Sequence, residues 1–397
     1  MALDGIVISN LVYELNQTLQ NARISKIAQP ETDELLLTIK TSNGQYRLLL
    51  SASASLPLIY LTDKNKPSPM TAPNFCMVLR KHLQGARILS VTQPELERVL
   101  IISMEHLDEM GDLCVRKLVY ELMGKYSNLI LCDSNDLVID SMKHVSGMMS
   151  SVREVLPGRA YFIPKTQNKD NPLTVGEAQF IDKLKSVSAP VYKAIYTSYT
   201  GISPFIAQEI CNQCDIDDRI IAGALSQAQL EKLYQYFDAL MNAVKECRFS
   251  PVILQENNSM KEFAVTEILS YPKEVQISYT DPSAMLRTFY ESKNTQDTMR
   301  QKSVHLRKQI QTILEKDYKK LDLQLKQLDD AQQKDTYRIY GELLNTYGYD
   351  IDEGAKKATV LNYYTNESVT IPLDENKSIK ENAKRYFDKY VKMKRHI

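Results

Sequence analysis

The sequence of 397 residues contains no tryptophan and no excess of charge, since 49 lysines and arginines balance 49 aspartates and glutamates. This balance excludes a uniformly basic nucleic-acid coat and an acidic tail protein, although basic patches can still be offset elsewhere. No run of about 18 apolar residues is present, so we expect no membrane insertion. The N-terminus lacks a basic region followed by a long apolar stretch, and we therefore expect no secretory signal.

Enzyme signatures are absent as well. No glycine-rich phosphate loop, dinucleotide fingerprint, zinc-protease motif or nucleophile elbow occurs. Cys211 and Cys214 form a lone CxxC pair, and a structural zinc site would need a second pair. The six cysteines are scattered along the chain, which favours free or buried thiols in a reducing compartment, the cytoplasm. We expect no metal and no cofactor.

The remaining composition is that of a soluble globular protein, with 43% hydrophobic and 25% charged residues. The length predicts two or three domains. In the first part of the chain, Asn43-Gly44 lies between two strand-like runs and is a strong hairpin signal. We expect an α+β domain whose meander sheet is closed or sandwiched against two helices. Helices are predicted from Ser9 or Asn10 and from Asn74, and strands over 24–28, 35–39, 46–50, 58–61, 88–92, 99–104, 114–122 and 128–132.

A second, helical part is predicted over 174–249, after a polar stretch (164–172) with the composition of a linker. Within it, Gly201 forms a turn and Ser203 caps a new helix that begins with Pro204. Such helix–turn–helix units often hold a nucleic-acid backbone at the turn, and simple helical packing is the alternative interpretation. A short hairpin is expected within 251–271, on the side of the sheet.

A long helix is predicted over 283–347, a stretch with no proline. A strand pair follows around Thr365-Asn366, and Ser378 and Glu381 have the spacing of a capping box before a last helix. Two helices with an inserted hairpin predict an antiparallel coiled-coil arm. The last helical pattern runs to the end of the sequence, which we interpret as a piece of a longer protein. The a/d seam of the arm is predicted at Leu314, Tyr318, Leu321, Leu325 and Leu328.

Positive charge gathers locally in the first part of the chain. The string Gly124-Lys125-Tyr126-Ser127-Asn128 predicts a turn between two strands, where a backbone N–H and an ammonium group can face a phosphate. The alternative is that these cations only solvate the surface. Further basic candidates are Lys143, His144 and Arg153.

Several long strings carry a more specific signal. They are 121–131 (ELMGKYSNLIL), 143–146 (KHVS), 153–158 (REVLPG), 201–204 (GISP), 362–365 (NYYT), 371–374 (IPLD) and 382–387 (NAKRYF). In the right order along essentially the whole chain, these strings resemble the NFACT family. This family includes bacterial RqcH and eukaryotic NEMF, and its streptococcal and staphylococcal members are named for fibronectin or fibrinogen binding.

The resemblance implies three parts: an NFACT-N domain over 1–172, similar to the N-terminal domain of formamidopyrimidine-DNA glycosylases, a helix–hairpin–helix domain over 173–282, and a coiled-coil arm over 283–397 with an inserted hairpin at 358–372. Family members normally continue into a further domain, NFACT-R. The glycosylases use an N-terminal Pro-Glu, whereas this chain begins Met1-Ala2-Leu3-Asp4. We therefore expect no base excision and no catalytic residues.

The resemblance also implies a function and its partners. We expect a cytoplasmic, ribosome-associated quality-control factor that binds the large ribosomal subunit and tRNA, namely alanyl-tRNA, and promotes C-terminal alanine tailing of stalled nascent chains. The family's acidic–arginine pair falls on Glu97 and Arg98, with glutamate in place of the usual aspartate, and a second acidic position falls on Asp4. The alternative is a surface-exposed adhesin that binds host fibronectin or fibrinogen.

Overall fold

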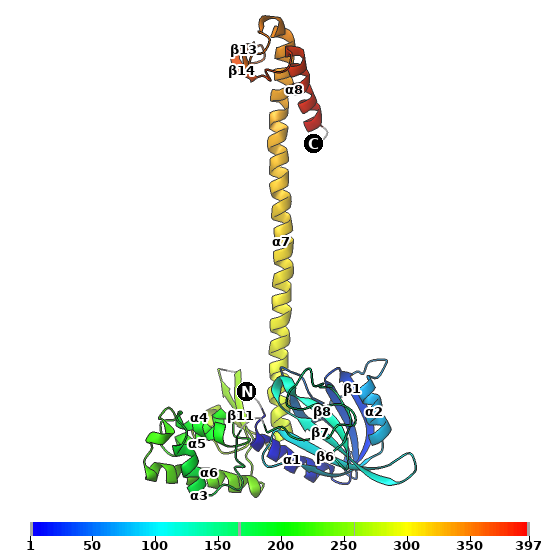
Figure 1. Ribbon diagram of the computed structural model, residues 1–397, viewed down its shortest axis with the longest axis vertical. Coiled ribbons are helices and arrows are strands. Elements are labelled where there is room, and N and C mark those ends of the chain that lie inside the picture. Colours follow the sequence, from blue (N-terminus) through cyan, green and yellow to red (C-terminus); the bar gives the residue numbers. More distant parts are fainter. Residues whose placement is uncertain (1–2, 166–167, 258, 395–397) are drawn as a thin grey trace. The chain divides into compact units, whose positions relative to one another are not determined.

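The computed structural model describes residues 3–165, 168–257 and 259–394, without the side chains of 294–302, 305 and 330–332. The chain divides into two compact units, Met1–Thr295 and Gln296–Ile397. Each unit has its own buried core. The helix α7 (Pro282–Tyr347) begins in the first unit and continues into the second (Figure 1).

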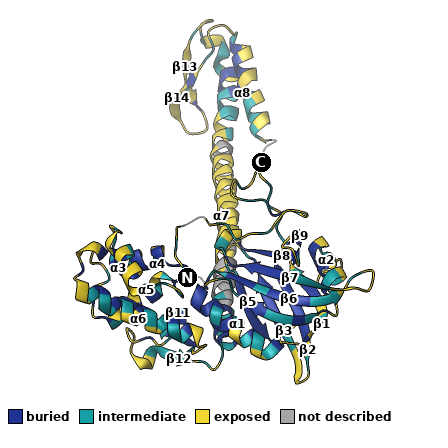
Figure 2. Ribbon diagram, turned by 60° about the horizontal axis from the view of Figure 1, so that its bottom comes forward, coloured by how far each residue is buried: buried dark blue, intermediate teal, exposed yellow. Residues whose placement is uncertain are grey.

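A nine-stranded antiparallel sheet dominates the first unit, with the order β4-β3-β2-β1-β5-β6-β7-β8-β9. The expected meander is confirmed, and Thr41 pairs with Gly44 across the expected hairpin. Figure 2 shows buried residues along the strands of this sheet. The strands are β1 (Arg23–Glu31), β2 (Glu34–Thr41), β3 (Gly44–Ser51), β4 (Leu58–Thr62), β5 (Arg87–Thr92), β6 (Val99–Leu107), β7 (Leu113–Glu121), β8 (Asn128–Asp133) and β9 (Val138–Ser141).

Two helices pack on this sheet, α1 (Gly5–Leu19) and α2 (Asn74–Leu83). The start of α2 agrees with the prediction, but the predicted start of α1 at Ser9 or Asn10 is wrong. The carboxylate of Asp4 accepts hydrogen bonds from the backbone N–H groups of Ile6 (3.1 Å) and Val7 (3.0 Å), so the cap lies five or six residues earlier than predicted. Leu11, Leu15 and Leu19 of α1 are fully buried, and burying each such side chain stabilises the fold by about 1.5–3 kcal/mol.

The helical part of the first unit consists of α3 (Glu177–Lys185), α4 (Val191–Ser198), α5 (Pro204–Gln213) and α6 (Gln227–Lys245). The rings of Phe180, Tyr199 and Phe237 form its buried centre, with centroids 4.9–5.5 Å apart. The hairpin expected within 251–271 is present. It joins a three-stranded sheet of its own, β10 (Val252–Glu256), β11 (Ser259–Ala264) and β12 (Gln276–Ser278), rather than the large sheet.

The second unit contains the rest of α7, the hairpin of β13 (Lys357–Asn362) and β14 (Glu367–Pro372), and α8 (Ile379–Lys394). The capping box is confirmed, because Glu381 accepts from the Ser378 N–H at 2.8 Å while the Ser378 hydroxyl accepts from the Glu381 N–H at 3.3 Å. Residues 395–397, at the end of the last predicted helix, lie outside the described residues.

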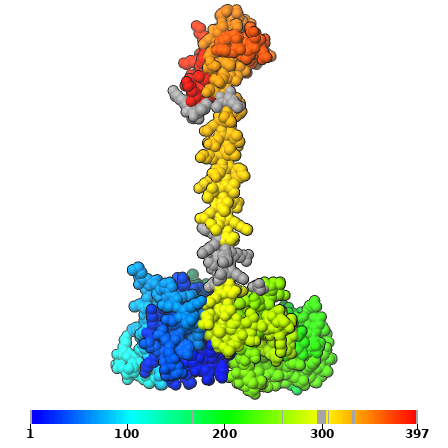
Figure 3. All heavy atoms as spheres, turned by 180° about the vertical axis from the view of Figure 1, so that it is seen from behind, coloured from blue at the N-terminus to red at the C-terminus, as the bar shows by residue number. Residues whose placement is uncertain are grey.

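The predicted seam lies along one exposed stretch of α7. Its five side chains are 46–66% exposed, and Figure 3 shows this stretch, in yellow, with its side chains projecting. The helix itself is as predicted, but the described residues contain no second helix along the seam. None of the described helices combines the length and the apolar composition that crossing a membrane requires.

Candidate functional site

The predicted pair Glu97–Arg98 follows a backbone turn that is strained. Glu95 has φ 51° and Leu96 has φ 141°, both in the region that favours glycine. The carbonyl of Pro94 closes the turn by accepting from the N–H groups of Leu96 (2.9 Å) and Glu97 (2.8 Å). Strain of this kind persists only where the surrounding structure enforces it, and it is concentrated at functional sites.

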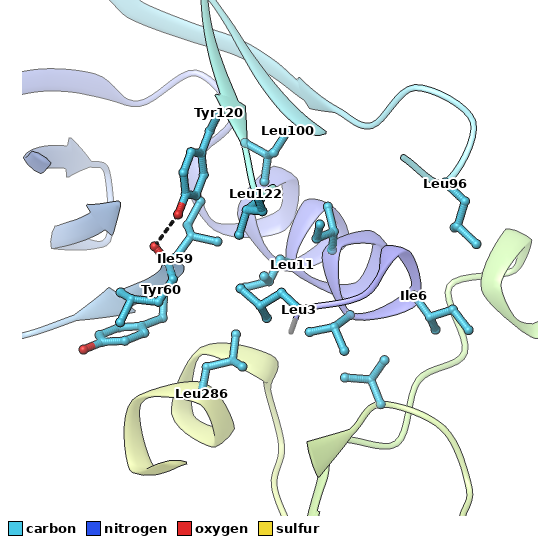
Figure 4. Close-up of a cluster of buried hydrophobic side chains, with 14 of the residues drawn as sticks. Leu3, Ile6, Leu11, Ile59, Tyr60, Leu96, Leu100, Tyr120, Leu122 and Leu286 are labelled. Carbon is cyan, nitrogen blue, oxygen red and sulfur yellow. Dashed lines mark hydrogen bonds between the residues drawn. The ribbon is translucent and has the colours of Figure 1, made fainter. Parts of the chain in front are cut away.

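Two glycines enforce the turn by letting three segments of backbone meet. The N–H of Gly5 donates to the carbonyl of Gly201 at 2.9 Å. A Cβ atom on Gly5 would lie 2.1 Å from the carbonyl oxygen of Leu96, and one on Gly201 would lie 2.2 Å from the same oxygen. Gly201 also has φ +76°. Figure 4 shows Leu96 and Ile6 in the same buried cluster at the start of α1.

Asp4 joins the starts of α1 and α5. In addition to capping α1, its carboxylate accepts from the hydroxyl of Ser203 at 2.8 Å, and that hydroxyl caps α5 by accepting from the N–H of Ile206 at 3.3 Å. Burial raises the pKa of Asp4, while the hydrogen bonds from Val7, Ser203 and Ile6 act to lower it. The structure therefore places Asp4 as a buried capping residue that positions α1 against the Gly201 turn.

Glu97 and Arg98 are both partly exposed at the start of β6. Burial and the neighbouring Glu95 raise the pKa of Glu97, while Arg98 and Lys169 lower it. Lys169 has its pKa lowered by burial and by the charge of Arg98, and Glu97 opposes this effect. Within the described part of the chain neither Arg98 nor Lys169 makes a direct ion pair. The charge of Arg98 acts on both Glu97 and Asp4, and that of Lys169 acts on Glu97.

Lys169 is the site residue that sequence reasoning missed, because it lies in the polar stretch 164–172 that has the composition of a linker. Its neighbour Asp170 donates from its N–H to the carbonyl of Ser198 (2.8 Å) and accepts from the N–H of Thr200 (3.0 Å). These bonds fix the segment beside the Gly201 turn. No local pattern marks this position, since the partners lie about 30 residues further along the chain.

The second group of predicted residues lies at the same end of the sheet. The carbonyl of Arg98 accepts from the N–H of Leu122 at 2.9 Å, and Val99 pairs with Glu121. Both carboxylate oxygens of Glu121 accept from one terminal nitrogen of Arg153, at 2.6 and 2.5 Å, and one of them also accepts from the Tyr161 hydroxyl at 2.9 Å. The Arg153 side chain is 10% exposed, so its charge is matched internally and fixes the loop that carries it.

The turn between β7 and β8 presents two of its predicted residues and buries two others. Lys125 and Tyr126 belong to the short helix η1 (Gly124–Tyr126), and the Tyr126 ring is 70% exposed with the Lys125 ammonium 4.9 Å from its centroid. Ser127 is buried and its hydroxyl accepts from the N–H of Met123 at 2.9 Å. Asn128 is also buried and supports the turn from within.

Asn128 connects this turn to the segment after β9. Its amide group donates to the carbonyl of Lys143 (2.8 Å) and accepts from the N–H of the same residue (2.9 Å). The Lys143 ammonium donates to the carbonyl of Ala52, and burial lowers the pKa of this lysine. His144 remains exposed, with Nε2 2.7 Å from the carboxylate of Asp140.

The structure thus separates the ten predicted residues into two kinds. Arg98, Lys125, Tyr126 and His144 present polar or aromatic surface at one end of the sheet, with Glu97 beside them. Asp4, Ser127, Asn128, Lys143 and Arg153 hold backbone or an internal partner. What the arrangement offers chemically is a surface with several cations and an exposed aromatic ring, suited to phosphates and unpaired bases.

The CxxC pair has no metal-binding surroundings. Burial raises the pKa of Cys211 to about 12 and that of Cys214 to about 11, which disfavours the thiolate that a metal needs. All six cysteines are free thiols. Among the residues the structure describes, no group of three or more His, Cys, Asp or Glu side chains is placed to hold a metal ion. Met1 and Ala2, which bear on the comparison with glycosylases, lie outside the described residues.

The family model for the NFACT N-terminal and middle domains matches residues 4–397. The chain belongs to this family, as the strings in the sequence predict.

Known relatives and solved structures agree with this membership. The protein named Rqc2 homolog RqcH of Bacillus subtilis is 34% identical over 400 residues, covering 100% of this chain and 68% of the relative. RqcH of Streptococcus suis is 31% identical and is covered to 67%. The solved structure of the fibrinogen binding protein from Staphylococcus aureus is 29% identical, with a TM-score of 0.63 over 73% of this chain and 99% of that one. The N-terminal part of the fibronectin/fibrinogen-binding protein from Streptococcus suis has a TM-score of 0.60, also at 29% identity, over 73% of this chain and 99% of that one.

Proposed function

We propose that this protein is a ribosome quality-control factor that binds the large ribosomal subunit and tRNA and promotes alanine tailing of stalled nascent chains. The names of the relatives support the setting: besides RqcH, a 92-residue segment is 30% identical to ribosome quality control complex subunit 2 of Saccharomyces cerevisiae. The observation that carries the proposal is the strained turn that leads into Arg98 at the end of the sheet, where the charge of Arg98 acts on Lys169.

This arrangement fits a phosphodiester backbone. Two cations held near each other raise each other's energy, and an anion placed between them removes that cost. Arg98 offers a planar fork that can bind a phosphate bidentately, and Lys169 offers a compact point charge. Tyr126, exposed at the same end of the sheet, can stack on an unpaired base. Glu97 orients Arg98 in this scheme.

The helical elements fit the same role. We interpret α4, the Gly201 turn and α5 as a helix–hairpin–helix unit whose turn faces the backbone of the tRNA, since the N-terminus of α5 lies at that turn. We interpret α7 as one helix of a coiled-coil arm, because its exposed apolar residues recur in steps of three and four. The protein positions alanyl-tRNA while the ribosome forms the peptide bonds, so the proposal requires no catalytic residue and no cofactor of its own.

Co-sedimentation tests the proposal. Large subunits carrying stalled peptidyl-tRNA are mixed with the full-length protein and with its Arg98→Ala variant, and bound protein and co-purified tRNA are measured. We expect wild type to pellet with the subunits and to retain alanine tRNA, and Arg98→Ala to lose most of the tRNA. Arg248→Ala, in which a 65% exposed side chain after α6 is removed, is the matched control. Equal tRNA recovery with all three proteins contradicts the proposal.

The alternative function is adhesion to host fibronectin or fibrinogen, and it rests on what the two similar solved structures are called. Its test is saturable binding of the purified protein to immobilised fibronectin and fibrinogen, together with a surface-exposed fraction on cells that have not lysed. Binding without any effect of Arg98→Ala would separate this activity from the tRNA interface.

A further inference from the structure

A hollow lies entirely within the second unit. It has a volume of about 500 Å³ and is formed by α7, the end of β14 and α8, the elements labelled near the C-terminus in Figure 1. This volume is in the range of sites that hold small ligands. Three tyrosines and two cations line it, together with Gln333, Thr336, Pro372 and Leu373.

The three tyrosines contact one another through Tyr386 and form an aromatic wall of the hollow. The rings of Tyr337 and Tyr386 are stacked, with centroids 6.0 Å apart and planes at 21°, and Tyr340 meets Tyr386 edge-on at 5.4 Å. The Tyr386 hydroxyl donates to the carbonyl of Pro372, which fixes the central ring to the end of β14. Tyr386 is buried, whereas Tyr337 and Tyr340 are partly exposed.

The charge of the hollow is of one sign. The ammonium of Lys389 lies 5.1 Å from the Tyr337 centroid and 5.7 Å from that of Tyr386. Arg385 also lines the hollow, with one nitrogen 3.4 Å from the Asp374 carboxylate, which is not part of the lining. Among the described residues, no aspartate or glutamate lines the hollow itself. The surface is therefore complementary to a ligand that is both anionic and flat.

We propose that this hollow binds one unpaired nucleotide of an RNA, with the base stacked on Tyr337 and the adjoining phosphate held by Lys389 and Arg385. Stacking on an aromatic side chain with a cation at the backbone is how proteins hold single-stranded nucleotides. A proline-rich peptide also binds aromatic grooves, but it carries no anionic group for the two cations. The proposal rests on the ribosome-binding function for its setting, and it assigns an RNA-binding site to the second unit.

Photocross-linking and titration test this site in the chain of 397 residues. The probe is a short single-stranded oligouridylate with one central 5-iodouridine, and the protein carries Arg98→Ala and Lys169→Ala to weaken the interface of the first unit. We expect cross-links in peptides that contain Tyr337, Tyr340 or Tyr386. We expect Tyr337→Leu and Lys389→Gln each to weaken binding about tenfold, in line with the loss of one stacked base or one cation contact.

The matched controls are Tyr349→Leu and Lys384→Gln, which change exposed side chains of the second unit that do not line the hollow. They should bind within about twofold of the parent. Circular dichroism shows whether Tyr337→Leu unfolds the second unit. If it does, Lys389→Gln alone tests the site. Cross-links confined to the first unit, or equal affinity of Lys389→Gln and Lys384→Gln, overturn the proposal, as does binding of a proline-rich peptide but not of the RNA.

The two proposals fail in different experiments. The oligonucleotide assay contains no ribosome, so loss of subunit co-sedimentation with intact cross-links at Tyr337 removes the quality-control function and leaves the nucleotide site. Intact co-sedimentation without cross-links in the second unit removes the nucleotide site and leaves the quality-control function.

Discussion

At the scale of single residues, the crossing of Gly5, Leu96 and Gly201 imposes the sharpest constraint on the first unit. An alanine at 201 places a methyl group 2.2 Å from the Leu96 oxygen and requires a positive φ. We expect Gly201→Ala to lower the free energy of unfolding by at least about 2 kcal/mol. Chemical denaturation measures this. Gly176→Ala is the control, because a Cβ there meets nothing within 4 Å, and similar losses in both variants would contradict the argument.

The Glu121–Arg153 pair supports a second prediction, since it is buried and satisfied by three hydrogen bonds. Arg153→Met leaves the carboxylate of Glu121 buried with only the Tyr161 hydroxyl as a partner. We expect a loss of about 3–5 kcal/mol in the free energy of unfolding, the cost of breaking a buried ion pair from one side.

Arg248→Met is the control for that experiment, because the exposed pair of Arg248 with Glu246 contributes little. Restoring the stability of Arg153→Met by adding Glu121→Gln would show that the uncompensated charge, rather than lost packing, causes the effect. No change on Arg153→Met would mean that Arg153 is held at the surface by other means and remains available for RNA.

The sequence predicts the exposed members of the candidate site better than their roles. Glu97, Arg98, Lys125 and Tyr126 lie at one end of the sheet because the meander brings the start of β6 and the end of β7 together. Burial decides the rest: Asp4 is a helix cap and Asn128 a backbone bridge, and neither role can be read from residue type alone. Lys169 was missed because its position depends on contacts distant in sequence.

At the scale of elements, local sequence patterns predicted those elements whose contacts join residues close together in the sequence. The hairpin at Asn43-Gly44, the helix from Asn74 and the capping box at Ser378 each depend on neighbours a few residues apart. The start of α1 was wrong because serine and asparagine are good caps in general, while Asp4 is selected by its bond with Ser203, 199 residues away. Tertiary contacts of this kind leave no trace in a local pattern.

A titratable carboxyl group, that of Glu14, lies at the contact between α1 and the first turn of α7. The hydroxyl of Ser283 donates to Glu14 at 2.7 Å and accepts from the N–H of Leu61 at 2.9 Å. Burial, with a contribution from Asp281, raises the pKa of Glu14 to about 7, while Ser283 acts to lower it. The buried surroundings of Glu14 therefore favour its protonated, neutral carboxyl group.

This raised pKa sets the direction of a pH effect. Between the ordinary glutamate pKa of 4.5 and the folded value of about 7, the folded protein binds more protons at Glu14 than the unfolded chain does. The stabilisation is complete below that range, falls as pH rises through it, and amounts to about 3 kcal/mol.

Glu14→Gln, which keeps an acceptor for Ser283, should remove this fall in stability. Unfolding free energies measured at several pH values between 4 and 8 check the slope. Glu231→Gln, at a partly exposed carboxylate near the start of α6 that accepts from Gln227, serves as the control. An identical pH dependence in the wild type and Glu14→Gln contradicts the assignment.

At the scale of the whole molecule, the balance of 49 positive and 49 negative side chains does not describe how the protein meets a charged partner. Asp4, Glu121 and Arg153 are buried or paired internally, so their charges act within the fold. Arg98, Lys169 and Lys125 are the cations that an RNA would meet at the end of the sheet. A neutral chain can therefore bind a polyanion through a local interface, and its affinity should depend on salt through the few phosphates that these cations contact.

The salt dependence of tRNA binding measures how many phosphates these cations contact. A plot of the logarithm of the association constant against that of the salt concentration has a slope set by the number of phosphates neutralised. We expect Arg98→Ala and Lys169→Ala each to reduce the steepness of that slope by about 1, and the double variant by about 2. Filter binding of alanine tRNA at several salt concentrations measures the three slopes. Lys245→Ala, on the exposed end of α6, should leave the slope unchanged. A uniform loss of affinity with the wild-type slope would mean that Arg98 contacts a base or another part of the protein instead, and would remove the phosphate contact from the proposed interface.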